Sequence, residues 1–291
     1  MRRTCALRCV KQTDMARRRL DSELVRRDLA ESRTAAKHLV EDGRVLVKGI
    51  PAQKPASQVD AGDSIVVLPP KEGVEYVSRG AHKLLGALDA FEDLLGPQAI
   101  EGARCLDAGA STGGFTQVLL ENGAASVLAV DVGYGQLAWQ LREDPRVEVL
   151  ERTNIRHLTR DQVGEEPAIV VGDMSFISLT KVLDNLVDVA PNATMMLMVK
   201  PQFEVGKGKV PSGGVVRNQE DIRGAVLAVA RYAESLGLKV WGVAPSPLPG
   251  PAGNVEYFLL LAPPSFSENP VEGDALVDAV ERAVEVGSAL L

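Results

Sequence analysis

The sequence predicts an α/β protein, built as a doubly wound, Rossmann-like sheet with a small α+β domain in front of it. The first observation is that short apolar strand patterns alternate with helical patterns between residues 104 and 261. The second is a glycine-rich turn after the first of these strands, typical of doubly wound sheets. The third is size, because 291 residues, 45% of them hydrophobic, suffice for one large domain or two of unequal size.

The chain divides into five segments. The first 14 residues are basic and lack the apolar core of a secretory signal, and Met15 opens a well-patterned segment. We therefore expect an upstream start or a disordered extension there. A run of prolines, charges and glycine breaks the pattern after residue 68 and predicts a linker. The predicted segments are an extension at 1–14, a small domain at 15–68, a linker at 69–77, a large domain at 78–264 and a helical tail at 265–291.

The small domain is predicted to contain two short helices followed by strands. Asp21 or Ser22 can cap the first helix, and Ser32 can cap the second. The runs RVLVK at 44–48 and SIVVL at 64–68 have the alternation of strands.

Charge is divided unevenly along the chain. Residues 1–60 contain 14 Lys or Arg and 8 Asp or Glu, a net charge of +6, whereas residues 61–291 contain 18 and 31, a net charge of −13. The total of −7, taken alone, argues against a nucleic-acid partner. A basic head on an acidic body instead favours a partner for the head; a basic tail without a ligand is the alternative.

The small domain resembles a known RNA-binding unit. The run LDSELVRRDLAESRTAAKHLVEDGRVLVKGIPAQKPASQVDAGDSIVV is similar to the αL-type RNA-binding domain of ribosomal proteins and pseudouridine synthases. The resemblance implies that the second helix and the loop after it lie against RNA phosphates, which position the protein without reading sequence. The residues expected to contact RNA in this domain are Arg18, Arg19, Arg33, Lys37 and Arg44.

The glycine-rich turn GASTGG follows the strand RCLD, which ends at Asp107. Alone it is a weak signal, and it lacks the second glycine of the dinucleotide pattern G-x-G-x-x-G. The next strand ends at Asp131, 24 residues further on, where a carboxylate can accept both ribose hydroxyls of an adenosine. The alternative for Asp131 is a cap on the turn that follows it.

The combination of DAGASTGGF with VDVG fits a site for S-adenosylmethionine (SAM) better than a site for NAD. A SAM site needs no pyrophosphate cradle, so the relaxed glycine spacing is accommodated. A third strand leads toward Asn154, which we expect to contact the adenine. The predicted cofactor-binding residues are Asp107, Gly109, Ser111, Gly113, Phe115, Asp131, Asn154 and Asp173.

Four ionisable residues stand at notable positions of the large domain. Asp173 follows the strand AIVV and Lys200 follows the strand at 195–199, so both are expected at the carboxyl ends of strands, where ligands bind. Lys83 lies in the motif SRGAHKL. Glu256 lies in an otherwise apolar strand pattern, where a charge requires a partner; a single inward salt bridge is the alternative for it.

The chain from about Met15 to about Leu261 resembles the TlyA family, bacterial methyltransferases of ribosomal RNA historically called haemolysins. The motifs that carry the resemblance are SRGAHKL, LDAGASTGGFTQVLL, DVGYGQLAW, ERTNIR, SFISL, VKPQFEVGKG and PLPGPAGNVEYF. The large domain is also similar to the wider FtsJ-type group with its Lys-Asp-Lys-Glu tetrad. The resemblance implies SAM-dependent 2′-O-ribose methylation, with cytidine as the target, and places the tetrad on Lys83, Asp173, Lys200 and Glu256.

The tetrad chemistry fits these residue types. A ribose 2′-hydroxyl is a weak nucleophile, so the enzyme must position it and help it lose a proton. Lys200 is expected to contact the 2′-oxygen, either as a neutral base or as a cation that stabilises developing alkoxide. Asp173 and Glu256 would hold the two lysines, and Lys83 would orient the target. Arg79, one helical turn before Lys83, is expected to add an RNA phosphate contact.

Three other functions remain open at this point. A membrane-active haemolysin would need an insertable segment, and the apolar runs fall short of about 18 residues. A non-enzymatic ribosome-assembly factor would not need the intact tetrad, and a nicotinamide dehydrogenase would need another glycine spacing. Three scattered cysteines and three scattered histidines favour no disulfide and no metal site. We expect a cytoplasmic monomer with rRNA as its partner.

Overall fold

The computed structural model describes residues 17–41, 43–60, 62–68, 75–96, 98–206, 208–265 and 270–289. The chain forms two compact units, Met1–Glu75 and Tyr76–Leu291, which are described separately. The expected extension at 1–14 and most of the expected linker lie outside the described residues.

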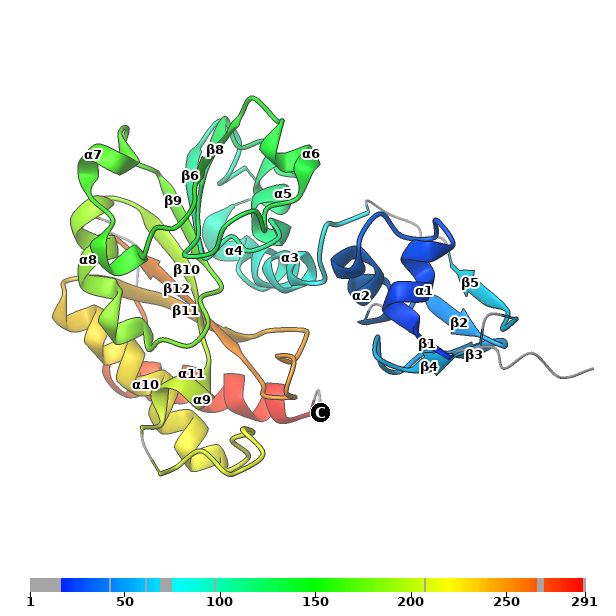
Figure 1. Cartoon of the computed structure of the whole chain (residues 1–291). Coiled ribbons are helices and arrows are strands. Elements are labelled where there is room, and N and C mark those ends of the chain that lie inside the picture. The colour runs from blue at the N-terminus through cyan, green and yellow to red at the C-terminus, as the bar shows by residue number, and fades with distance from the viewer. Residues whose placement is uncertain are drawn as a thin grey trace, which may run out of the picture. The chain divides into compact units, whose positions relative to one another are not determined.

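The small unit packs two helices against short antiparallel strands (Figure 1). Its elements are β1 (Arg18–Arg19), α1 (Leu20–Arg26), α2 (Arg33–Glu41), β2 (Val45–Val47), β3 (Ile50–Pro51), β4 (Gln58–Val59) and β5 (Ile65–Val67). Strand β1 pairs with β4, and β2 lies between β3 and β5. The core is formed by Leu20, Leu24, Ala36, Val40, Val45 and Val59. These side chains come from both helices and two strands, so the unit has a hydrophobic core of its own.

One predicted helix cap is confirmed and the other is wrong. The hydroxyl of Ser32 accepts a hydrogen bond from the backbone N–H of Ala35 at 3.1 Å, as a cap for α2 does. Helix α1, however, begins at Leu20, before both residues predicted to cap it. The carboxylate of Asp21 binds arginine side chains instead, because a guanidinium offers two charge-assisted hydrogen bonds.

The large unit is built on a seven-stranded sheet in the order β11-β12-β10-β9-β6-β7-β8. The strands are β6 (Arg104–Ala108), β7 (Ser126–Val130), β8 (Val147–Leu150), β9 (Ile169–Gly172), β10 (Thr194–Val199), β11 (Lys239–Pro245) and β12 (Tyr257–Ala262). Strand β12 is antiparallel to both neighbours, and the pairs from β10 to β8 are parallel. The predicted doubly wound, mostly parallel sheet is thus confirmed, and one strand in it is reversed.

Helices cover both faces of this sheet (Figure 1). The helices are α3 (Gly80–Ala90), α4 (Glu92–Leu95), α5 (Gly114–Glu121), α6 (Trp139–Arg142), α7 (Arg160–Val163), α8 (Leu183–Val189), α9 (Pro201–Glu204), α10 (Gln219–Ser235) and α11 (Gly273–Ser288). Side chains of β6 alternate between the faces, since Leu106 packs with α8 and α10 whereas Cys105 packs with α3 and α5. Burial raises the pKa of the Cys105 thiol to about 12, which keeps it protonated.

Helix α11 contains most of the described part of the predicted tail, and it packs on the large unit. It buries Leu276, Val280 and Val284 in the same core as the sheet. A Cβ at Gly287 would lie 2.8 Å from Val255 Cγ1, so only glycine allows this close approach of α11 to the segment before β12. In the described ranges, no helix is long and apolar enough to cross a membrane.

Candidate active site

The four residues of the predicted tetrad meet at one edge of the large sheet. Asp173 follows β9 and Lys200 follows β10, so both lie at the carboxyl ends of parallel strands. Glu256 lies directly before β12, not inside it as the pattern predicted. Because β12 is reversed and Tyr257 pairs with Val199, the start of β12 lies beside the end of β10. Lys83 reaches the same place from helix α3.

The tetrad forms a chain of alternating charges. The Nζ of Lys83 donates hydrogen bonds to Glu256 Oε2 at 2.6 Å and to Asp173 Oδ2 at 3.4 Å. The Nζ of Lys200 lies 2.6 Å from Asp173 Oδ1 and donates to Ser175 Oγ at 2.8 Å. Lys83, Lys200 and Glu256 are 4%, 6% and 1% exposed. Two cations and two anions buried together balance in charge, which compensates for part of their desolvation.

Asp173 is the centre of this chain. Burial alone would raise the pKa of its carboxyl, but the charges of Lys200 and Lys83 outweigh burial and hold the pKa below its ordinary value. Asp173 therefore remains a carboxylate at neutral pH. One carboxylate oxygen faces each lysine, so Asp173 sets the position of both ammonium groups.

Glu256 is held by a tight loop around Gly250. The backbone N–H of Gly250 donates to the carbonyl of Asn254 at 2.8 Å, which closes a turn of the motif PLPGPAGNVEYF. A Cβ at Gly250 would lie 2.5 Å from Glu256 Oε1. The glycine thus lets the loop backbone approach the carboxylate directly.

Two further polar residues join the loops that carry the tetrad. Asn254 is buried, and its side chain accepts from the N–H of Val216 at 2.9 Å and donates to the carbonyl of Gly214 at 2.9 Å. Glu204 accepts from Ser178 Oγ at 2.6 Å and from the N–H of Leu179 at 2.8 Å. Asn254 links the segment of Gly214 and Val216 to the loop of Glu256, and Glu204 links α9 to the segment after Asp173.

Sequence reasoning missed Ser175, Glu204 and Asn254 as parts of the site. Each lies in a motif that was recognised: Ser175 is the first residue of SFISL, Glu204 lies in VKPQFEVGKG and Asn254 lies in PLPGPAGNVEYF. Their polar side chains next to apolar residues were the available signal. The partners that make them important come from distant loops, which no local pattern reveals.

A pocket of about 310 Å³ opens beside Asp173 at the carboxyl ends of the parallel strands. A volume of this size is typical of small-molecule sites. Its lining residues are Gly109, Ser111, Val130, Asp131, Val132, Gln136, Thr153, Asn154, Ile155, Asp173, Met174, Ser175, Phe176, Ile177 and Val182. Five of the eight predicted cofactor residues are among them: Gly109, Ser111, Asp131, Asn154 and Asp173.

Asp131 has two roles in the structure. Its Oδ2 accepts from the N–H of Ser111 at 2.9 Å, and its Oδ1 accepts from the N–H of Gly133 at 2.7 Å. It therefore caps the following turn, as the alternative interpretation held, and joins that turn to the glycine-rich loop. Each carboxylate oxygen has more than one lone pair, so Asp131 can also accept hydroxyl hydrogen bonds in the pocket that it lines.

Three predicted cofactor residues do not line the pocket. Gly113 has a φ of 97°, and a Cβ there would lie 2.3 Å from Leu141 Cδ1, so this glycine allows close packing against α6. The ring of Phe115 is buried in the core and stacks on Phe258 at a centroid distance of 6.1 Å. Both residues shape the glycine-rich loop and α5 from behind.

Asp107 lies beneath the same loop. It is buried, and it accepts a hydrogen bond from Thr116 Oγ1 at 2.7 Å. Burial raises the pKa of its carboxyl to about 7, while the hydrogen bonds from Thr116 act in the opposite direction. Asp107 therefore supports the loop from the end of β6 and does not contact the pocket.

The residues predicted to bind RNA differ in accessibility. Arg18, Arg19, Arg33 and Lys37 are exposed on the small unit. Arg44 is 19% exposed; it donates to the carbonyl of Leu68 and forms an ion pair with Glu75 at 2.7 Å, so its guanidinium is engaged in the fold. Arg79, directly before α3 in the large unit, is half-buried.

The protein belongs to the class of Rossmann-like methyltransferases. The features that indicate this class are the reversed strand, the pocket at the strand ends and the buried Lys-Asp-Lys-Glu cluster. Residues 76–262 match the FtsJ-like methyltransferase family, and residues 18–65 match the S4 domain. The methyltransferase TlyA of Mycobacterium tuberculosis is 54% identical over 275 residues, 94% of this chain and 100% of the relative. The chain belongs to the TlyA family of FtsJ-like methyltransferases.

Other relatives support this assignment. Hemolysin A of Brachyspira hyodysenteriae is 35% identical over 243 residues, 82% of this chain and 97% of the relative. The solved structure of a candidate hemolysin from Streptococcus thermophilus has a TM-score of 0.72 at 34% identity and covers 95% of this chain and 97% of that chain. A similar protein from Lactococcus lactis has a TM-score of 0.65 at 37% identity, covering 74% of this chain and 100% of its own.

Proposed function

We propose that this enzyme transfers a methyl group from SAM to the 2′-hydroxyl of cytidine in ribosomal RNA. The observation that carries the proposal is the chain Glu256–Lys83–Asp173–Lys200 beside the pocket. The relative from M. tuberculosis is a 16S/23S rRNA (cytidine-2′-O)-methyltransferase, and one from Campylobacter jejuni acts on 23S rRNA. Ribosomal subunits in the cytoplasm are thus the substrate to test first.

The pocket offers groups suited to SAM. Asp131 supplies a carboxylate for ribose hydroxyls and Asn154 supplies an amide for the adenine. Gly109 has a φ of 87°, and a Cβ there would meet Met174 Cγ at 3.2 Å, so glycine keeps the loop against the pocket wall. Bound SAM supplies a methyl group already activated for transfer.

Lys200 is the residue assigned to the target hydroxyl. Its Nζ can hold the 2′-oxygen in place and either accept the hydroxyl proton or stabilise negative charge as the proton leaves. Asp173 keeps this nitrogen at the edge of the pocket, because the two groups are 2.6 Å apart. As the bond from the 2′-oxygen to the methyl carbon forms, the bond from that carbon to the cofactor sulfur would break, and the hydroxyl proton would pass to Nζ in its neutral form or, if Nζ is charged, to water.

Lys83 and Glu256 serve the reaction through Asp173. Lys83 forms its shortest contact with Glu256 and a longer one with Asp173, so Glu256 anchors Lys83. Lys83 in turn fixes the second oxygen of Asp173. Removing either residue would free Asp173 to move relative to Lys200.

The S4 unit is assigned to RNA binding. Arg18, Arg19, Arg33 and Lys37 present exposed positive charge, which suits the phosphate backbone of RNA. Such contacts dock the enzyme, and the choice of nucleotide is left to the catalytic unit.

Transfer of tritium from methyl-labelled SAM to purified 30S and 50S subunits tests the proposal. Label is expected in RNA as 2′-O-methylcytidine after nuclease digestion. Absence of label from both subunits, with SAM binding intact, would contradict the proposed function. Label on a base instead of a ribose would contradict the role assigned to Lys200.

A further inference from the structure

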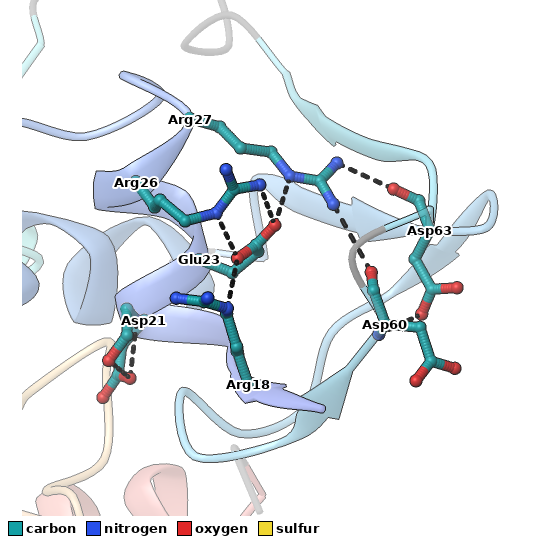
Figure 2. A network of polar contacts seen from close by, with 8 residues as sticks. Arg18, Asp21, Glu23, Arg26, Arg27, Asp60 and Asp63 are labelled. Carbon is teal, nitrogen blue, oxygen red and sulfur yellow. Dashed lines mark hydrogen bonds and ion pairs between the residues drawn. The ribbon is translucent and has the colours of Figure 1, made fainter. Parts of the chain in front are cut away.

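We propose that Asp21 and Glu23, two buried carboxylates of the S4 unit, are positioning residues that orient arginine side chains to bind RNA phosphates. The inference deepens the proposed function and rests on RNA being the substrate. Figure 2 shows the contacts of Glu23, which lies among Arg18, Arg26 and Arg27.

Asp21 joins two arginines that are 14 residues apart in sequence. Arg19 binds it with a fork, Nε to Oδ1 at 3.1 Å and Nη2 to Oδ2 at 2.7 Å. Arg33, the first residue of α2, donates from Nη2 to the same Oδ2 at 3.2 Å. The N–H of Ser22 also donates to Oδ1 at 2.7 Å and holds the carboxylate in place. Asp21 thereby sets β1 and α2 arginines side by side.

Glu23 gathers three arginines. Arg26 binds it with a second fork, Nε to Oε2 at 2.8 Å and Nη2 to Oε1 at 2.6 Å. Arg27 donates from Nε to Oε1 at 2.8 Å, and Arg18 Nε lies 4.0 Å from Oε2. The Glu23 side chain is 1% exposed, so its carboxylate is compensated by these arginines and not by solvent.

The arginines divide into two kinds. Arg27 also donates to the carbonyls of Asp63 and Asp60, at 2.8 and 3.4 Å, and its side chain is 21% exposed, so it holds the fold together. The other four side chains are 46–62% exposed: Arg18, Arg19, Arg26 and Arg33. Each of these four exposed cations is paired with one of the two buried carboxylates.

The fork geometry leaves a second edge for a ligand. A guanidinium has five N–H groups in one plane, and the forks of Arg19 and Arg26 use the Nε and Nη2 side. Within the part of the chain that the structure describes, all side-chain hydrogen bonds of Arg19 and Arg26 come from Nε and Nη2, and Nη1 donates none. The edge with Nη1 matches the oxygens of a phosphate. A side chain already held in one orientation loses less entropy on binding.

The carboxylates stay charged at neutral pH. The hydrogen bonds from Arg26 and Arg27 outweigh burial and lower the pKa of Glu23 to about 2. Hydrogen bonds from Arg19 and Arg33 likewise hold the pKa of Asp21 below its ordinary value. The four exposed arginines, Arg18, Arg19, Arg26 and Arg33, outnumber the two carboxylates that they contact, so this group of side chains has a net positive charge.

Positioning and net charge predict opposite results when a carboxylate is neutralised. Asp21→Asn and Glu23→Gln each remove one negative charge next to the arginines proposed to bind RNA. By Coulomb attraction alone, this change would tighten RNA binding. If the carboxylates position the arginines, binding weakens despite the added positive charge. The sign of the change therefore separates the two explanations.

The test measures the affinity of the full chain for purified ribosomal subunits at several salt concentrations. Asp21→Asn and Glu23→Gln are each expected to weaken binding about three- to tenfold. Glu31→Gln, an exposed acid of the same unit outside the network, is expected to leave affinity within about twofold. Tighter or unchanged binding of the first two variants, or an equal loss in Glu31→Gln, overturns the proposal.

Charge-preserving variants keep the test decisive even where a neutralised carboxylate disturbs folding. Arg19→Lys and Arg26→Lys retain the charge but cannot form a fork, and each is expected to weaken binding about threefold. In the background Arg19→Gln with Arg33→Gln, Asp21→Asn should then no longer weaken RNA binding, and by Coulomb attraction should leave it unchanged or slightly tighter. A further loss there would mean that Asp21 acts through the fold, and unchanged binding of the lysine variants would also contradict the inference.

Kinetics separate this inference from the proposed function. The carboxylate variants should raise KM for ribosomal subunits and leave kcat and SAM affinity unchanged. Failure of the wild-type chain to methylate RNA would contradict the function alone, since subunit binding is measured separately. Full wild-type activity with unchanged KM in both variants would contradict the positioning role alone.

Discussion

Each unit contains a cluster of ion pairs between carboxylates and basic side chains. The two clusters differ in whether the basic side chains are buried or exposed. In the catalytic unit both lysines are buried, Lys83 between two carboxylates and Lys200 against Asp173, and the two lysines match two acids in number. In the S4 unit the carboxylates Asp21 and Glu23 are buried, and the arginines around them extend into solvent. The first arrangement suits the role in catalysis proposed for Lys200, and the second suits the binding of RNA phosphates proposed for the arginines.

The choice of cation follows from the task. A lysine amine is a compact donor that can exchange a proton, which suits a residue at a reacting hydroxyl. An arginine stays charged and offers a planar fork, which suits phosphate recognition. The carboxylates are the constant element, since in both clusters they fix where the cations stand.

The largest expected effect is on catalysis by Lys200→Met. This variant removes the nitrogen assigned to the 2′-oxygen and keeps a side chain of similar length, so kcat should fall at least about 10²-fold. SAM affinity in a calorimetric titration should stay unchanged, because Lys200 does not line the pocket. Lys181→Met, an exposed lysine, is the matched control and should keep normal activity. Equal loss of SAM binding and transfer would show that the two functions are not separate.

Asp131→Ala should mainly affect the cofactor. Loss of its hydrogen bonds to Ser111 and Gly133 loosens the turn that borders the pocket and removes the carboxylate from it. The Kd for SAM is expected to rise about 10- to 100-fold. Affinity for ribosomal subunits should remain normal, as should SAM binding by the exposed-acid control Asp161→Asn. An unchanged Kd would exclude Asp131 from the cofactor site.

Asp107→Asn should stabilise the catalytic unit in a pH-dependent way. The folded-state pKa of about 7 lies above the ordinary value of 3.8, so the folded protein holds this proton more tightly than the unfolded chain. Its contribution to stability is complete below about pH 4 and is lost as pH rises through 7. At about pH 8 the variant should gain about 2–4 kcal/mol in free energy of unfolding, and at about pH 4 little. Denaturant titrations at both pH values measure this, and equal effects at both would contradict it.

Glu23→Gln should show the opposite pH dependence in the S4 unit. The pKa of Glu23 is lowered to about 2 from 4.5, so its contribution is present above 4.5 and is lost as pH falls toward 2. The melting temperature of this unit should fall by a few degrees at about pH 6, and the difference from wild type should shrink toward about pH 2. Thermal unfolding of the full chain, followed by circular dichroism and evaluated at the transition of the S4 unit, checks this, with Glu31→Gln as the control. A difference that grows in acid would contradict the ionised state of Glu23.

Several site residues could be read from the sequence because of how parallel sheets are built. Asp131, Asp173 and Lys200 each follow a buried strand, and the carboxyl ends of parallel strands meet at one edge. Gly113 and Phe115 stand in the same motif as true pocket residues, so the local pattern did not separate them. Packing of Gly113 against α6 and of Phe115 in the core decides that these two residues face away from the pocket.

The sequence by itself determined the alternation of strands and helices and the two-part organisation, and it supplied Lys83, Asp173, Lys200 and Glu256 as candidate tetrad residues, because each leaves a local or motif-level trace. Only the tertiary structure decided how those parts meet. Glu256 reaches the lysines because β12 runs antiparallel to β10. Asp21 binds Arg33 because folding brings α1 and α2 together. Strand direction and long-range ion pairs depend on contacts between distant residues, and these exist only once the core has formed.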